Sequence, residues 1–180
     1  MNKLVLWLRR KRPGTILKVR DFILNTGLFG IAPLSASLSI RVFLTNGVVE
    51  DRGVVSVHAV TDTFVAQLVD TLQSSEATFS DYKYHDSGTE NTAEDQTDTG
   101  LGTACGDDRT IGTQIEGATS NIYKSVATHT YTAAFSIVEH GLFNAATVGI
   151  LMDRSVFSAV GVAAGDKIEF TYQLTCTAGG

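Results

Sequence analysis

Alternation of apolar and polar side chains near the carboxyl end is the feature that most constrains how this chain folds. Over residues 167–174, apolar residues alternate strictly with polar ones. Successive side chains of a β-strand point to opposite faces of a sheet. The pattern therefore predicts a half-buried strand of an antiparallel sheet. Its buried face would consist of Ile168, Phe170, Tyr172 and Leu174.

Other segments predict further strands. Residues 37–44 also alternate and end near Asn46-Gly47, a pair that favours a tight hairpin turn. We therefore expect the returning strand over residues 48–57. Weaker signals predict β-structure at Leu101, Ile111 and Ile115. The remaining expected strands cover residues 81–89, 137–143 and 150–157, and residues 121–126 are expected to pair with residues 128–138.

The overall composition agrees with a β-rich domain. The chain has 17 glycines and only 2 prolines, which suits many turns and few rigid linkers. We predict a mainly β fold: an antiparallel, jelly-roll-like β-sandwich with one or two short helices and an extended N-terminal arm. The 180 residues would form an arm over 1–14 and one sandwich domain over 15–180, with a long polar loop near 86–120.

Two segments have apolar residues at helical spacing. Residues 61–73 predict a helix that Thr61 or Asp62 caps and that packs across one side of the sheet. Its apolar face would consist of Phe64, Val65, Leu68, Val69 and Leu72. Residues 15–25 predict a second helix, with a strand as the alternative.

The first twelve residues form an apolar and then basic arm. The first twenty residues carry seven positive charges and no acidic residue, whereas the rest carry seven positive and nineteen negative charges, a net −12. This asymmetry favours binding of the arm to the acidic body of another copy. Nucleic acid is the alternative partner, because lysine and arginine bind phosphates without sequence preference. The arm residues expected to contact a partner are Leu4, Leu6, Trp7, Arg9, Arg10, Lys11 and Arg12.

The apolar run in the arm does not resemble a secretion signal, because it is short and its basic cluster follows it. The sequence also contains no stretch of about 20 apolar residues that would span a membrane. We therefore expect no membrane partner.

Motifs for chemistry are weak throughout the chain. The histidines at positions 58, 85, 129 and 140 are not spaced like the ligands of a metal ion. The acidic loop over 90–98 lacks the regular spacing of acidic residues that a calcium-binding loop has. The adjacent pairs His85-Asp86 and Glu139-His140 would point to opposite faces of their strands, so neither pair predicts a shared site. We expect no enzyme activity, no cofactor and no catalytic, cofactor-binding or metal residue.

Two other pairs of residues call for interpretation. Cys105 and Cys176 are far apart in sequence, and we expect both to be reduced, although a disulfide between them stays open. Glu139 and Arg154 each lie in a strongly apolar stretch, where an unpaired buried charge is costly. They are candidates for a structural pair across adjacent strands; the alternative is that both face water.

Near the carboxyl end, a strand enters Glu-x-Gly-Leu-Phe at 139–143, a second strand contains Asp-Arg-x-x-Phe at 153–157, and Gly-Asp at 165–166 precedes the last strand. This order of segments resembles structural proteins of tailed bacteriophages. Residues 82–93 and 98–103 also resemble a segment of these proteins, although Glu90 replaces the second glycine of the Gly-Thr-Gly-x-Thr-Ala pattern. The resemblance covers residues 82–180, whereas the arm and first hairpin match only loosely.

This resemblance implies a β-sandwich that assembles into symmetric oligomers on capsids, necks or tails. We expect a non-enzymatic virion protein, assembled in the host cytoplasm, that acts as a capsid cement or decoration protein. Its partners would be other virion proteins, above all the major capsid protein, and further copies of itself, with a trimer as the expected oligomer. A tail, neck or fibre-attachment protein is the alternative.

Overall fold

The structure is a computed structural model that describes residues 34–58, 60–73 and 79–177. The predicted arm over 1–14 and the predicted helix over 15–25 lie outside these residues. The strands are β1 (Leu34–Phe43), β2 (Val49–His58), β3 (Tyr84–Gly88), β4 (Thr110–Ile111), β5 (Thr113–Glu116), β6 (Ile122–Thr130), β7 (Phe135–Phe143), β8 (Leu151–Val162) and β9 (Lys167–Cys176). The helices are α3 (Asp62–Gln73) and a short 3-10 helix (Phe79–Asp81).

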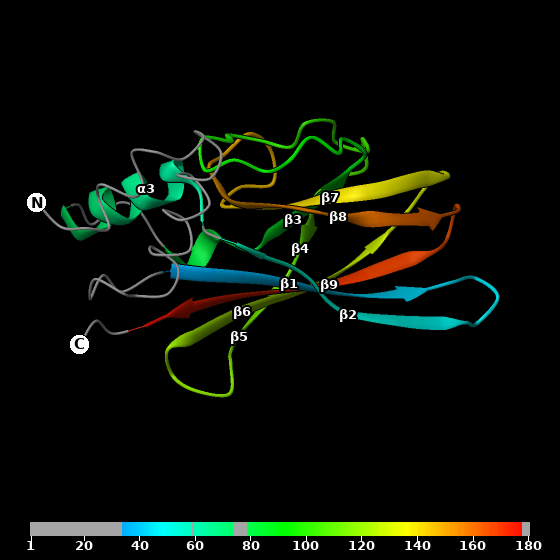
Figure 1. Cartoon of the computed structure of the whole chain (residues 1–180), viewed down its shortest axis with the longest axis horizontal. Helices are drawn as coiled ribbons and strands as arrows, with labels where there is room; N and C mark the ends of the chain where they lie inside the picture. The colour runs from blue at the N-terminus through cyan, green and yellow to red at the C-terminus, as the bar shows by residue number, and fades with distance from the viewer. Residues whose placement is uncertain (1–33, 59, 74–78, 178–180) are drawn as a thin grey trace, which may run out of the picture.

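Two antiparallel sheets face each other (Figure 1). The first, sheet A, has five strands in the order β2-β1-β9-β6-β5, and the second, sheet B, has four in the order β4-β3-β7-β8. The mainly β, antiparallel sandwich predicted from the sequence is therefore confirmed. The chain passes between the sheets after β2, β4, β6 and β8, so residues distant in sequence meet in the interior.

Strand β9 is the central strand of sheet A and pairs with both β1 and β6. Its alternation has the predicted effect, because Ile168, Phe170 and Tyr172 are completely buried. Ile40 of β1 lies opposite Phe170 and is buried on the same face. Local alternation on β1 and β9 thus builds the inner face of this sheet.

The predicted hairpin at Asn46-Gly47 joins β1 to β2. Gly47 has φ of 85°, a left-handed conformation that glycine adopts at low cost, and its amide donates to the carbonyl of Leu44. The returning strand is continuous from Val49 to His58. Two register shifts in the pairing with β1 accommodate its polar middle, next to Gly53 at φ 61°.

Two apolar clusters fill the space between the sheets. One is built around Leu38, Ile40, Ile137 and Phe170, and the other around Tyr82, Leu142, Met152 and Tyr172. Both clusters draw residues from sheet A and sheet B. Burial of these side chains is the main source of stability of such a sandwich.

Helix α3 begins as predicted but packs differently. The Phe64 amide donates to the Thr61 hydroxyl at 3.3 Å, and the Phe64 ring packs edge-on against Tyr82 at 5.1 Å. The prediction that the whole apolar face packs across a sheet is wrong, because Val69 and Leu72 are 47% and 79% exposed. The helix contacts sheet B through its first turn, where Thr61 bonds to β8, and lies at one end of the sandwich (Figure 1).

Two strand predictions are wrong in detail. Residues 79–81 form the 3-10 helix, so β3 starts only at Tyr84. Residues 121–126 and 128–138 do not pair with each other: one strand, β6, runs from Ile122 to Thr130 in sheet A, and β7 belongs to sheet B. The inward residues of β6 are Ser125, Ala127 and His129, so this strand lacks the apolar alternation that marks its neighbours.

The predicted polar loop is shorter than expected. Strand β3 continues to Gly88, and the short strands β4 and β5 occupy residues 110–116. The long irregular segment covers residues 89–109, contains one isolated bridge between Gly88 and Ala104, and runs over the outside of sheet B (Figure 1). Irregular segments of this length need their own anchors, because their backbone groups are not paired in a ladder.

Candidate functional site

The anchor of this loop is a buried ion pair on the β7–β8 hairpin. Arg154 lies opposite Gly141, two residues along β7 from Glu139, which is a diagonal cross-strand position. Its Nε atom is 2.8 Å from Oε2 of Glu139, and the two side chains are 4% and 0% exposed. The predicted structural pair is confirmed, and the alternative that both residues face water is wrong.

Glu139 also accepts three backbone hydrogen bonds from the loop. The amides of Glu90 and Thr103 donate to its Oε1 at 3.1 and 2.9 Å, and the amide of Gly102 donates to its Oε2 at 2.9 Å. Each carboxylate oxygen therefore accepts two hydrogen bonds, one of the four coming from Arg154. The carboxylate holds together two loop segments that are distant in sequence.

Arg154 extends the anchor to a third acid. Its Nη1 atom is 3.1 Å from Oδ2 of Asp98, and that oxygen also accepts the Asp95 amide. Burial lowers the pKa of Arg154, but the hydrogen bonds that it donates to Glu139 and Asp98, together with the negative charges of these residues, more than offset this effect and raise the pKa. We call Glu139, Arg154 and Asp98 the loop clamp.

A glycine permits the close approach of the loop to the clamp. A Cβ atom on Gly88 would lie 2.4 Å from Oε1 of Glu139 and 2.3 Å from the carbonyl oxygen of Thr103. Such contacts are far inside van der Waals distance, so any side chain there would push the loop away. The close packing of the loop and of the Glu139 carboxylate against this strand end therefore requires a residue without a side chain at position 88.

A second polar cluster lies between the sheets. The Nδ1 atom of His85 is 2.9 Å from Nε2 of His140, and its Nε2 atom is 2.7 Å from the hydroxyl of Ser125. Burial, with a smaller effect of nearby His129, lowers the pKa of His85 to about 3. A neutral imidazole can donate through one nitrogen and accept through the other, as these neighbours require. We call His85, His140 and Ser125 the histidine cluster.

The acidic neighbours of these histidines point elsewhere, as the alternation of a strand predicts. Asp86 accepts from Nε of Arg109 at 3.1 Å, and Glu139 belongs to the loop clamp. His140 stacks instead near Phe170, with ring centroids 4.6 Å apart. The two acid–imidazole neighbours in the sequence therefore do not form shared sites.

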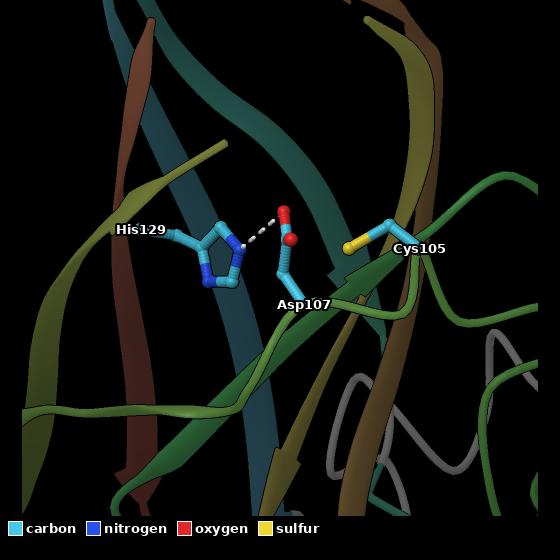
Figure 2. Close-up of side chains that lie close together, drawn as sticks. All are labelled: Cys105, Asp107 and His129. Carbon is cyan, nitrogen blue, oxygen red and sulfur yellow. Dashed lines mark ion pairs between the residues drawn. The ribbon is translucent and has the colours of Figure 1, made fainter. Parts of the chain in front are cut away.

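A third group joins Cys105 and Asp107 to His129 (Figure 2). One ligand-type atom from each residue lies within 4.8 Å of the other two. The sequence showed no metal-ligand spacing here, because the first two residues follow β3 and the third lies in β6. Sequence reasoning missed this group, and only the packing of the two sheets brings it together.

Both cysteines are free thiols. The disulfide that the sequence left open is therefore not formed: Cys105 is partly buried in the third group, and Cys176 is exposed at the end of β9.

Three open hollows on the described surface lie along sheet A and its loops. They are lined by residues such as Tyr123, Thr128 and Arg41, and none of the three has a histidine in its wall. Within the described part of the chain, no helix is both long and apolar enough to cross a membrane. The predicted arm residues, Leu4, Leu6, Trp7, Arg9, Arg10, Lys11 and Arg12, lie outside the described residues.

Comparison with protein-family models, with curated proteins and with solved structures found no match to this chain. The class of the protein is thus set by its own geometry. It is an antiparallel β-sandwich in which a buried ion pair fixes a long surface loop on one sheet.

Proposed function

We propose that the protein is a non-enzymatic structural protein of a tailed-bacteriophage virion, and specifically a capsid cement or decoration protein. One observation carries the proposal: the charged residues of the two motifs on which the resemblance depends, Glu139 and Arg154, bond to each other and to the loop. A carboxylate that already accepts four hydrogen bonds is poorly placed to act as a base. These motif residues support a structural role.

Exposed apolar side chains offer surfaces for assembly. On the edge strand β2, Val49, Val54 and Val57 are 54%, 61% and 67% exposed. Edge strands expose unpaired backbone groups and readily bind another chain. Such a surface fits contacts with further copies or with capsid subunits, and the net charge of −12 after residue 20 fits contact with the basic arm of a neighbour.

The test uses virions whose genome encodes this chain but from which the chain has been deleted. Purified protein is added back in two forms, complete and lacking residues 1–14, after circular dichroism has shown that both are folded. We expect the complete form to bind capsids, seen as regular surface density by electron microscopy, and to restore resistance to heat and osmotic shock. The truncated form should not bind.

Three outcomes contradict parts of this proposal. Density on tails or necks, with unchanged capsids, would replace the cement function with the tail or neck alternative. Equal binding by the truncated form would remove the role of the arm. Binding of the complete form to free DNA but to no virion part would support nucleic acid as the partner and overturn the structural proposal.

A further inference from the structure

Cys105, Asp107 and His129 converge because of one turn and one strand. Cys105 and Asp107 flank Gly106, whose φ of 91° is left-handed and bends the chain sharply. His129 is an inward residue of β6 and only 2% exposed. Figure 2 shows the thiol, the carboxylate and the imidazole directed toward a common space.

The buried imidazole has one nitrogen with a partner and one without. The Nδ1 atom of His129 is 2.9 Å from the hydroxyl of Thr110. Its Nε2 atom has no hydrogen-bond partner among the described residues, and Oδ2 of Asp107 is 3.6 Å away, too far for a hydrogen bond. Buried polar atoms normally have hydrogen-bond partners, and a nitrogen and a carboxylate oxygen that face each other from beyond hydrogen-bond distance are placed to share one cation.

The carboxylate of Asp107 is held in place from its other side. The hydroxyl of Thr132 donates to its Oδ1 at 2.5 Å, and the Thr132 amide donates to its Oδ2 at 3.3 Å. These bonds fix the orientation of the carboxylate, so that its Oδ2 atom faces the imidazole.

The spacing fits a tetrahedral ion. Nitrogen and oxygen ligands about 2.0–2.1 Å from Zn²⁺ at the tetrahedral angle lie about 3.4 Å apart. The observed separation between Nε2 of His129 and Oδ2 of Asp107 is 3.6 Å. The thiol of Cys105 lies within 4.8 Å of one ligand-type atom of each of the other two residues and 3.6 Å from the hydroxyl of Ser87.

We propose that Cys105, Asp107 and His129 bind one Zn²⁺ ion, with a water molecule as the fourth ligand. Sulfur, nitrogen and carboxylate oxygen together are a ligand set that suits zinc. Thr110 orients the imidazole by bonding its other nitrogen, as partners of metal-bound histidines commonly do. Binding converts the thiol to a thiolate and releases one proton to solvent. The ion ties the end of the loop to β6 of the opposite sheet.

The test uses the complete chain without an affinity tag, freed of metal by chelation. Co²⁺ is added as a spectroscopic probe, because a cobalt–thiolate bond gives a near-ultraviolet charge-transfer band and tetrahedral cobalt gives intense visible bands. We expect both bands at one ion per chain and their loss when Zn²⁺ displaces Co²⁺. Zn²⁺ in hundredfold excess over its Kd should raise Tm by about 5 °C or more.

Matched variants identify the ligands. Cys105→Ser should abolish the charge-transfer band, whereas Cys176→Ser should leave it unchanged, because these are the two cysteines of the chain. Asp107→Asn should weaken Co²⁺ binding at least about tenfold, since it removes a charged ligand, and Asp108→Asn should not. Circular dichroism checks that each variant is folded.

Several results would overturn the proposal. They are a charge-transfer band that survives Cys105→Ser, a band lost with Cys176→Ser, or no metal-dependent spectrum or Tm shift at millimolar Zn²⁺ and Co²⁺. The last result would leave Asp107 and His129 as a structural acid–imidazole pair only.

Discussion

Two of the three arginine–glutamate pairs among the described residues have the same chemistry in different surroundings. Arg154 and Glu139 are 4% and 0% exposed, whereas Arg41 and Glu169, on β1 and β9, are 48% and 20% exposed. The exposed pair even has the shorter contact, 2.6 Å against 2.8 Å. Water screens the exposed pair, whereas loss of one partner in the buried pair leaves an uncompensated charge. Burial rather than distance therefore decides which pair matters for stability.

This comparison gives a prediction for single substitutions. Arg154→Met should lower the free energy of unfolding by about 3–5 kcal/mol, because Glu139 then keeps its buried charge without a cation. The control Arg41→Met should change the free energy of unfolding much less, because water screens the exposed pair. Urea denaturation of both variants and of the unchanged protein measures the difference. Equal losses in the two variants would contradict the importance of the loop clamp.

At the scale of elements, the loop over residues 89–103 depends on one carboxylate for its position. Each oxygen of Glu139 accepts two hydrogen bonds, so Glu139→Gln would turn an NH₂ group toward donors. We expect the amides of Gly102 and Thr103 to exchange with solvent about tenfold faster or more in this variant, since each loses a charge-assisted bond.

Native-state hydrogen exchange followed by NMR measures this effect. The matched control is the amide of Cys105, which follows in the same irregular segment over residues 89–109 but donates to the carbonyl of Ser87 at 2.9 Å. Its exchange rate should stay unchanged. Acceleration of all three amides alike would show that Glu139→Gln destabilises the whole fold rather than the attachment of the loop.

The elements also show what the sequence could predict. Strands β1 and β9 carry apolar alternation that is local and therefore readable. Strand β6 lacks this pattern because two of its inward residues, Ser125 and His129, bond to polar groups of the other sheet and the third, Ala127, is small. The spacing of apolar residues over 61–73 correctly predicts the helix α3. Burial of its apolar face depends on where the helix packs in the fold, and no local sequence pattern determines that position.

The same reasoning applies to the sites. Glu139 and Arg154 could be paired from the sequence because charges in apolar stretches need partners. Asp98 could not be assigned to them, since an acidic residue in a polar loop has no distinguishing pattern. The group of Cys105, Asp107 and His129 depends on packing between the two sheets, so its parts gave no signal.

At the scale of the whole molecule, the histidine cluster joins the two sheets. Ser125 comes from sheet A, whereas His85 and His140 come from sheet B, and the ring of His140 contacts Phe170 of sheet A. The interface between the sheets is therefore partly polar and requires neutral imidazole at His85. Stability of the entire sandwich should then depend on pH through this residue.

The direction of that dependence follows from linkage. Burial lowers the pKa of His85 to about 3 in the folded protein, whereas an unfolded histidine titrates near about 6.5. Between these values the unfolded chain binds a proton that the folded protein excludes. The contribution of neutral His85 to the free energy of unfolding is therefore complete above a pH of about 6.5. It is lost progressively as the pH falls, by up to about 1.4 kcal/mol per pH unit.

We therefore predict that the free energy of unfolding decreases from pH 6.5 to pH 5, measured by urea denaturation, and that His85→Gln flattens this slope. Hydrogen bonds lower the pKa of Glu90, Asp95 and Asp166, so these carboxylates lose their contributions only at more acidic pH and do not obscure this window. The imidazole resonances of His85 should stay constant over the same range in the folded protein. A His85 resonance that titrates near pH 6.5 without unfolding would contradict the prediction, because the sheets would then tolerate a charge between them.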